Sequence, residues 1–284
     1  MHRCIKAFIK MIKPEDQIGN ALAFLTGYIF AQFTMDESLP YALTSTCFVL
    51  MAANALNQCT DVDADKVNKP DRPIPSGLIN LLEGYIMVTI LYASSLALAA
   101  LVNTTFFALT CFAVSLGLMY SIRPFKLKDR LLLSNLSIAI GYGTLNFLLG
   151  WSVTRPLEYA PVHILIMLTA FDLFANISKD YRDMKGDMIS NVRTIPIVIG
   201  RSKAATLQFS ALYVVFTLPL IYFITSVESN PVLLLLTPIG LLITYSAHKS
   251  VNMYRDIECY KYMMLLYILM RIIIIAACMI RQSI

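Results

Sequence analysis

Two acidic clusters are the residues of this 284-residue chain best suited to carry out chemistry. One contains an asparagine and two aspartates at positions i, i+4 and i+8, and the other contains three aspartates at i, i+3 and i+7. In order they are Asn57, Asp61 and Asp65, followed by Asp180, Asp183 and Asp187. On a helix, each spacing places its three side chains on one face. Like charges four residues apart destabilise a helix by a few tenths of a kcal/mol, so a shared cation would offset the repulsion.

The cation that best suits these clusters is a hard divalent ion that also binds phosphate oxygens. Magnesium typically takes one or two carboxylates from a protein and completes its shell with water and phosphate. A single cluster is better explained as a solvated acidic face. Two clusters of matched placement, each preceded by an asparagine in register (Asn57 and Asn176), favour a diphosphate held by metal.

Basic residues also gather in two segments, one directly after the first cluster and one at the end of the fourth expected span. The stretch 68–77 contains three prolines, which stiffen it, and it offers Lys69 and Arg72 to a phosphate. A rigid turn with solvated bases is the alternative. The segment 120–128 supplies further bases, which membrane anchoring explains equally well.

The composition indicates a membrane protein. Hydrophobic residues make up 57% of the chain and charged residues only 14%, whereas soluble domains are about one quarter charged. The apolar residues form blocks of about twenty, the length that crosses the hydrocarbon core as a helix. We therefore predict an all-α polytopic bundle in a single domain, 1–284, with nine spans and cap loops on the cytoplasmic side. The spans are expected at about 17–34, 39–57, 81–102, 104–121, 133–152, 161–178, 204–226, 231–247 and 262–280.

Lys and Arg set the expected orientation. They concentrate in the N-terminal arm and in the connections after spans 2, 4, 6 and 8, which predicts a cytoplasmic N-terminus and a cytoplasmic site. The same bias explains the net charge of +5 without a nucleic-acid partner. Cysteines and histidines are scattered, so neither disulfides nor a zinc site are indicated. Asp172 and Arg271 lie inside spans, where ionisable groups are rare, and we hypothesise that they pair.

With these motifs, the chain resembles the UbiA superfamily of intramembrane prenyltransferases, whose pattern is N-D-x-x-D-x-x-x-D followed by a second D-x-x-D-x-x-x-D. The second cluster matches fully, whereas Gln58 departs from the usual Asp of the first. The segments 68–77 and 120–128 and the Thr194-Ile-Pro sequence are also similar to family loops. The resemblance covers roughly 13–203.

This resemblance implies a fold, a cofactor and a reaction. Two Mg²⁺ ions would clamp the diphosphate of an isoprenoid donor, and ionisation would give an allylic cation that a lipophilic acceptor captures. The implied metal ligands are Asp61, Asp65, Asp180, Asp183 and Asp187, with Asn57 completing the catalytic set. The implied diphosphate-binding residues are Lys69, Arg72, Tyr120, Lys126 and Lys179. The isoprenoid tail would lie in an apolar tunnel open to the lipid bilayer. Whether Asp63, which lies on a different helical face, replaces the acid missing at Gln58 stays open at this point.

Alternatives remain for the acceptor of the prenyl group and for the class of protein. The segment 68–77 most resembles members that transfer geranylgeranyl-type chains, including archaeal ether-lipid synthases and chlorophyll synthases. An aromatic, quinone-precursor acceptor stays open. A membrane transporter is the alternative from another class, because intramembrane acids also line ion paths. A phosphatidyltransferase-type enzyme ranks lower, because its acidic motif is missing, and Gln58 leaves open a non-catalytic relative.

Overall fold

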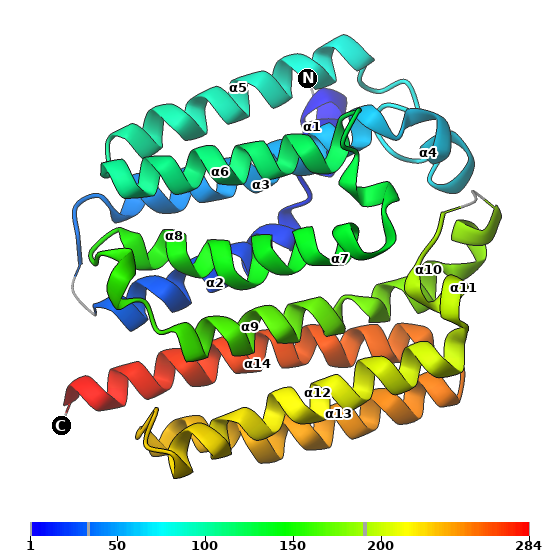
Figure 1. Ribbon diagram of the computed structural model, residues 1–284. Helices are drawn as coiled ribbons and strands as arrows, with labels where there is room; N and C mark the ends of the chain where they lie inside the picture. Colours follow the sequence, from blue (N-terminus) through cyan, green and yellow to red (C-terminus); the bar gives the residue numbers. More distant parts are fainter. Residues whose placement is uncertain (1, 33–34, 190–191, 284) are drawn as a thin grey trace.

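The computed structural model describes residues 2–32, 35–189 and 192–283, and within them every regular element is helical (Figure 1). The helices that form the bundle run roughly antiparallel to one another (Figure 1). They are α2 (Pro14–Ala31), α3 (Leu39–Thr60), α5 (Leu81–Ala100), α6 (Thr104–Ser121), α7 (Leu131–Ala139), α8 (Asn146–Ser152), α9 (Val162–Ala175), α12 (Arg201–Ile224), α13 (Leu236–Asn252) and α14 (Asp256–Ser283). A π-helical turn, η2 (Ile140–Leu145), joins α7 to α8 within one span.

Short helices gather at one end of the bundle, which we call the cap end (Figure 1, right). They are α4 (Val62–Asn68), the 3₁₀ turn η1 (Leu127–Asp129), α10 (Ile177–Ile189) and α11 (Ile195–Ile199). The amphipathic α1 (His2–Ile12) packs against α3. The opposite, far end holds two further 3₁₀ turns, η3 (Leu157–Tyr159) and η4 (Pro231–Leu235). Functional side chains concentrate on such connecting segments because a rigid scaffold positions them.

The predicted polytopic α-helical bundle is confirmed, with a small difference in the number of spans. Within the described residues, eight helical segments are long and apolar enough to cross a membrane. The first expected span, 17–34, corresponds to α2, which is helical but starts with the polar residues Glu15, Asp16 and Gln17 and is not among the eight. Residues 33–34 of that expectation lie outside the described part. Several spans also begin earlier than expected, because helices such as α12 and α14 start in polar sequence at the cap end.

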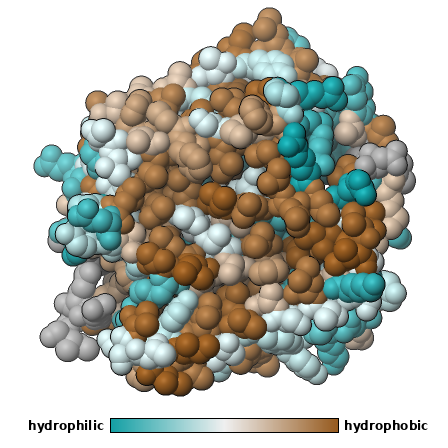
Figure 2. All heavy atoms as spheres, viewed as in Figure 1, coloured by the Kyte–Doolittle hydropathy of each residue, from teal (hydrophilic) through white to brown (hydrophobic). Residues whose placement is uncertain are grey.

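The surface matches a lipid environment. Figure 2 shows apolar side chains over much of the bundle, with hydrophilic ones gathered towards its ends. Large apolar residues in mid-helix are exposed, for example Ile90, Val214 and Leu242. Exposed apolar surface of this extent is unfavourable in water, and lipid tails would cover it.

Glycines bring two helices into backbone contact. A Cβ on Gly27 of α2 would lie 1.9 Å from the carbonyl oxygen of Phe147, and a Cβ on Gly150 of α8 would lie 1.9 Å from that of Phe24. Any larger residue would therefore clash with main chain on the neighbouring helix. Small residues of this kind let membrane helices approach closely. The crossing fixes α2 against α8 beside the elements that carry the acidic clusters.

Candidate functional site

The first acidic cluster directs its oxygens at one cation. The Lys128 ammonium, from η1, donates to Asn57 Oδ1 at 2.9 Å, to Thr60 Oγ1 at 2.9 Å and to Asp61 Oδ1 at 2.6 Å. The Lys128 side chain is only 9% exposed, so these contacts are largely shielded from water. The end of α3 thus forms an oxygen-lined cation site.

The helix does not continue straight through this cluster. Thr60 ends α3 and Val62 begins α4, with Asp61 between them at φ −107°, ψ 14°. The Asp65 amide still donates to the Asp61 carbonyl at 2.8 Å, so the two aspartates stay one turn apart. The predicted single helical face is therefore bent at Asp61.

Asp65 pairs with a base from the proline-rich segment. Its carboxylate is buried and accepts from Arg72 Nη1 at 2.5 Å. The segment doubles back after α4, with Gly77 at φ 73°, a left-handed conformation that favours glycine. The predicted diphosphate-binding Arg72 consequently lies directly beside the first cluster.

Gln58 and Asp63 lie away from this cation site. The Gln58 side chain is buried and its Nε2 donates to the main-chain oxygen of Met11 at 2.9 Å. The Asp63 carboxylate is 97% exposed and pairs with Lys66 at 3.2 Å. Position 58 therefore anchors α1, and Asp63 does not replace the acid that is missing there.

The second cluster begins where the sixth predicted span bends. α9 ends at Ala175, and a new helix, α10, begins at Ile177. α10 carries the three aspartates. Asn176 Nδ2 donates to Asn135 Oδ1 of α7 at 2.8 Å, and Asn135 also hydrogen-bonds the Asp180 side chain. Asp183 accepts from Arg182 Nε at 3.0 Å. Asp187 interacts electrostatically with Asp180 and Asp183, so the three carboxylates share one environment.

Lys69 links the two clusters. Burial lowers its pKa from the usual value, and the neighbouring cations Arg72 and Lys179 lower it further. Asp183 of the second cluster and Asp65 of the first both act in the opposite direction. Lys69 therefore lies near enough to feel the charge of both clusters, which indicates that the two clusters lie on the same side of the cap end.

Lys13 joins the same group of cations. Burial is the main cause that lowers its pKa, Asp16 opposes the shift, and Arg72, Lys179 and Lys69 lower the pKa further. Four bases from three segments of the chain therefore gather beside the acidic clusters. Cations brought together in this way repel one another until an anion binds between them.

Two of the predicted diphosphate-binding residues lie differently. Lys126 pairs with Asp129 at 2.8 Å rather than with an acidic cluster. Its backbone adopts φ 36°, and the chain turns there so that Lys128 enters the cation site instead. Tyr120 is half-buried near the end of α6. Among the described residues, no hydrogen bond joins it to either cluster.

The donor atoms fit magnesium. In the described part of the chain, no three His, Cys, Asp or Glu residues are close enough to hold a metal ion by themselves. Asp61, Asp65 and Asp183 are instead each paired with a basic side chain, Lys128, Arg72 and Arg182 respectively. The convergence of Asn57 and Asp61 oxygens on a cation nevertheless shows the hard-oxygen chemistry that Mg²⁺ requires. An ion at that position would replace the Lys128 ammonium.

Sequence reasoning missed three of these residues. Lys128 was counted among the bases of 120–128, but the turn at Lys126 that selects it has no sequence signal. Lys13 was assigned only to membrane orientation, although its place just before Pro14 at the start of α2 marks a helix entry. Asn135 lies in an apolar segment, where a buried asparagine is itself a signal.

Asp172 and Arg271 form the hypothesised pair, with 3.3 Å between Oδ2 and Nη2. The same Nη2 donates to the Tyr142 carbonyl at 3.1 Å, and Tyr142 lies in the π-helical turn η2. A π-turn frees carbonyls from the helical ladder, which explains why this oxygen accepts a side-chain donor. The pair lies eight residues, or about 12 Å of helix rise, from Asp180 towards the far end.

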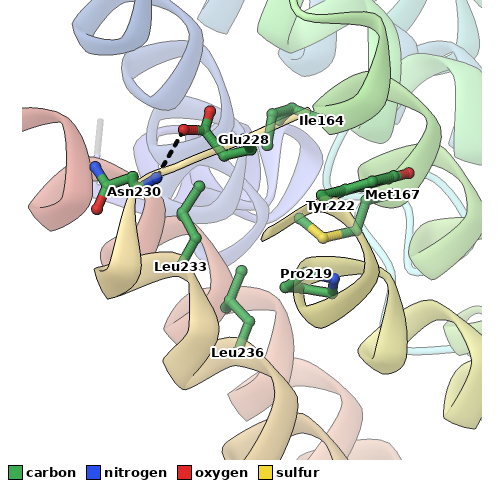
Figure 3. Close-up of a pocket in the computed structure, with 8 residues that line it drawn as sticks. All are labelled: Ile164, Met167, Pro219, Tyr222, Glu228, Asn230, Leu233 and Leu236. Atoms are coloured by element: carbon green, nitrogen blue, oxygen red, sulfur yellow. Dashed lines mark hydrogen bonds between the residues drawn. The ribbon is translucent and has the colours of Figure 1, made fainter. Parts of the chain in front are cut away.

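A small pocket lies at the far end, between the start of α9, the end of α12 and η4 (Figure 3). Ile164, Leu233 and Leu236 contribute apolar walls, and Glu228 accepts from the Asn230 amide. Because Ile164 lies at the opposite end of its span from the Asp180 cluster, this pocket is separate from the acidic site. The apolar tunnel expected beside the clusters stays a prediction.

Comparisons with known proteins agree with the geometry. A sequence profile of the UbiA prenyltransferase family matches residues 20–269. A digeranylgeranylglyceryl phosphate synthase from Methanosarcina mazei is 31% identical over 218 residues, which cover 73% of this chain and 73% of that protein. Another from Methanococcus maripaludis is 29% identical over 274 residues, which cover 89% of this chain and 93% of that protein.

Solved structures show the same fold. A UbiA homolog from Archaeoglobus fulgidus bound to GPP and Mg²⁺ has a TM-score of 0.78 at 18% identity, and the match covers 96% of this chain and 99% of that one. A structure from work on digeranylgeranylglyceryl phosphate synthase in membranes has a TM-score of 0.77 at 21% identity, with coverage of 98% and 99%.

The fold and the site thus define a multi-pass helical membrane enzyme of the prenyltransferase class. The chain belongs to the UbiA prenyltransferase family, and the resemblance inferred from its motifs is confirmed. Because the chain belongs to an enzyme family, the enzyme interpretation is preferred to the membrane-transporter alternative. Magnesium, the expected cofactor, is the ion in two of the neighbouring structures.

Proposed function

We propose that this enzyme transfers a geranylgeranyl group from its diphosphate to the free hydroxyl of geranylgeranylglyceryl phosphate. The observation that carries the proposal is the group of cations, Lys13, Lys69, Arg72 and Lys179, shared by two acidic clusters. A diphosphate is an anion of the size and charge that such a site would hold. The names of the relatives support the ether-lipid acceptor.

The residues of the chain would divide the work between metal binding and leaving-group stabilisation. Asn57 and the five aspartates, Asp61, Asp65, Asp180, Asp183 and Asp187, would hold two Mg²⁺ ions, which neutralise diphosphate charge when bound. Lys69, Arg72 and Lys179 would donate to the diphosphate oxygens as the carbon–oxygen bond breaks. Donors already directed at developing charge stabilise a transition state without reorganisation. Lys13 joins this set because it lies near the same cations, whereas Lys128 would orient Asn57 and Asp61, whose oxygens it contacts.

The reaction needs a nucleophile and protection from water. The acceptor oxygen would form the new bond to C1 of the allylic cation and release its proton, while diphosphate leaves with the bonding electrons. Exclusion of water from the site would favour the acceptor over hydrolysis of the cation. We further propose that the cap end is cytoplasmic, because the bases of the N-terminal arm and of the cap segments lie on that side.

The proposal is tested by incubating the full chain in lipid with radiolabelled geranylgeranyl diphosphate, Mg²⁺ and one acceptor at a time. The acceptors are geranylgeranylglyceryl phosphate, an aromatic quinone precursor and a chlorophyll precursor. We expect label in the glyceryl phosphate product, lost on chelation and in Asp61→Asn and Asp183→Asn. The exposed acid provides the matched control, so Asp63→Asn should keep its activity. Transfer to the aromatic acceptor alone would overturn the acceptor assignment.

A further inference from the structure

Arg201, the first residue of α12, joins three elements at the cap end. Its Nη1 donates to Asp256 Oδ2 at 3.1 Å, and its Nη2 donates to Asp256 Oδ1 and, at 2.8 Å, to the Val251 carbonyl. Val251 is in the last turn of α13 and Asp256 begins α14. The planar fork of a guanidinium makes such two-point contacts, which an ammonium cannot reproduce.

The face of the same guanidinium lies on α10. It is 5.2 Å from the centre of the Tyr181 ring and 4.5 Å from that of Tyr254. Tyr181 is 2% exposed, and its hydroxyl has no hydrogen-bond partner among the described residues. The ring, and not the hydroxyl, is therefore what attaches α10 to Arg201.

The contact between Arg201 and the Tyr181 ring determines which way the three aspartates of α10 point. Tyr181 directly follows Asp180, so the two side chains point about 100° apart around α10. Fixing the buried ring fixes the direction in which the carboxylates point. A second contact joins α10 to α14, because the Arg182 guanidinium lies 4.4 Å from the centre of the Tyr260 ring of α14. α10 thus takes its rotation from α12 and α14.

We propose that Arg201 is a positioning residue of the magnesium site: held by Asp256, it fixes Tyr181 and so directs the aspartates of α10. This proposal rests on the proposed function of those aspartates. Residues that orient metal ligands from behind change metal affinity on the order of 10-fold to 100-fold when they are altered. Arg201 touches neither donor nor acceptor in this assignment.

The test measures Mn²⁺ binding by electron paramagnetic resonance, with the full chain in lipid and inorganic diphosphate present. Arg201→Gln and Tyr181→Leu should each weaken Mn²⁺ binding on the order of 10-fold, and the double variant should be no weaker than either. Tyr181→Phe keeps the ring and should bind normally. Arg255→Gln is the matched control, since Arg255 is an exposed cap-end base that pairs with Glu258 at 3.6 Å.

Unchanged Mn²⁺ binding in a folded Arg201→Gln variant, or equal losses in Tyr181→Phe and Tyr181→Leu, would overturn the proposal. If Arg201→Gln does not fold, Arg201→Lys and Tyr181→Leu decide the same question. Asp183→Asn separates the two proposals. If it binds Mn²⁺ as the wild type does, the metal assignment itself fails. If it loses Mn²⁺ while the Arg201 variants keep it, only the positioning role fails.

Discussion

The Gln58 side-chain amide donates to the main-chain oxygen of Met11, and this bond ties the membrane-spanning α3 to the N-terminal α1. The position that departs from the family motif therefore faces away from the oxygens of Asn57 and Asp61. The departure removes no ligand from the cation site as the structure places it.

Restoring the motif acid at this position should damage the protein without improving its metal site. Gln58→Asp removes the donor to Met11 and buries a carboxylate, and an unsatisfied buried group costs about 1–3 kcal/mol or more. We expect a lower midpoint of thermal unfolding and no tighter Mn²⁺ binding. Tighter binding in Gln58→Asp would show that position 58 reaches the metal after all.

Lys128 and Lys126 are two residues apart but should differ in importance. Lys128→Gln removes the cation that bridges Asn57 and Asp61, and loss of a side chain that orients metal ligands typically costs about 10-fold to 100-fold in activity. Lys126→Gln breaks only a partly exposed pair with Asp129 and should change turnover less than about threefold. Turnover measured at saturating donor distinguishes them, and equal losses would contradict the assigned geometry.

The alkaline limit of donor binding should move in Lys13→Arg. Lys13 attracts diphosphate only while protonated, and its pKa is lowered, chiefly by burial. Affinity should therefore begin to fall at a lower pH than ordinary lysines would dictate. Arginine stays charged over this range, so the alkaline limb of kcat/KM for the donor should move to higher pH. Lys10→Arg, on the exposed part of α1, is the control and should leave the profile in place.

Removing one partner of the Asp172–Arg271 pair should destabilise the bundle more than removing both. Removing one partner of a buried ion pair costs about 3–5 kcal/mol because it leaves an uncompensated charge. Asp172→Leu and Arg271→Leu should each lower the stability in detergent, and the double variant should recover part of the loss. Exchange of the two residues should recover less, because the Tyr142 carbonyl then loses its donor. Additive losses in the double variant would argue against direct coupling.

The sequence predicted the helical bundle because blocks of apolar residues with few charges have one stable solution in lipid, a helix. It also predicted that each acidic cluster follows an apolar helix, and the clusters do follow α3 and α9. It could not identify which base meets which acid. Lys128 reaches Asp61 across 67 positions, through a turn set by the backbone at Lys126. Contacts of that kind depend on how helices pack, which a single sequence does not encode locally.

The glycine crossing between α2 and α8 limits how this enzyme can admit a bulky isoprenoid. With the Gly27 and Gly150 backbones each resting on main chain of the other helix, there is no side-chain layer left between them to rearrange. α2 and α8 are therefore expected to move as one rigid unit. Any lateral gate for lipid-borne substrates must open along another seam of the bundle.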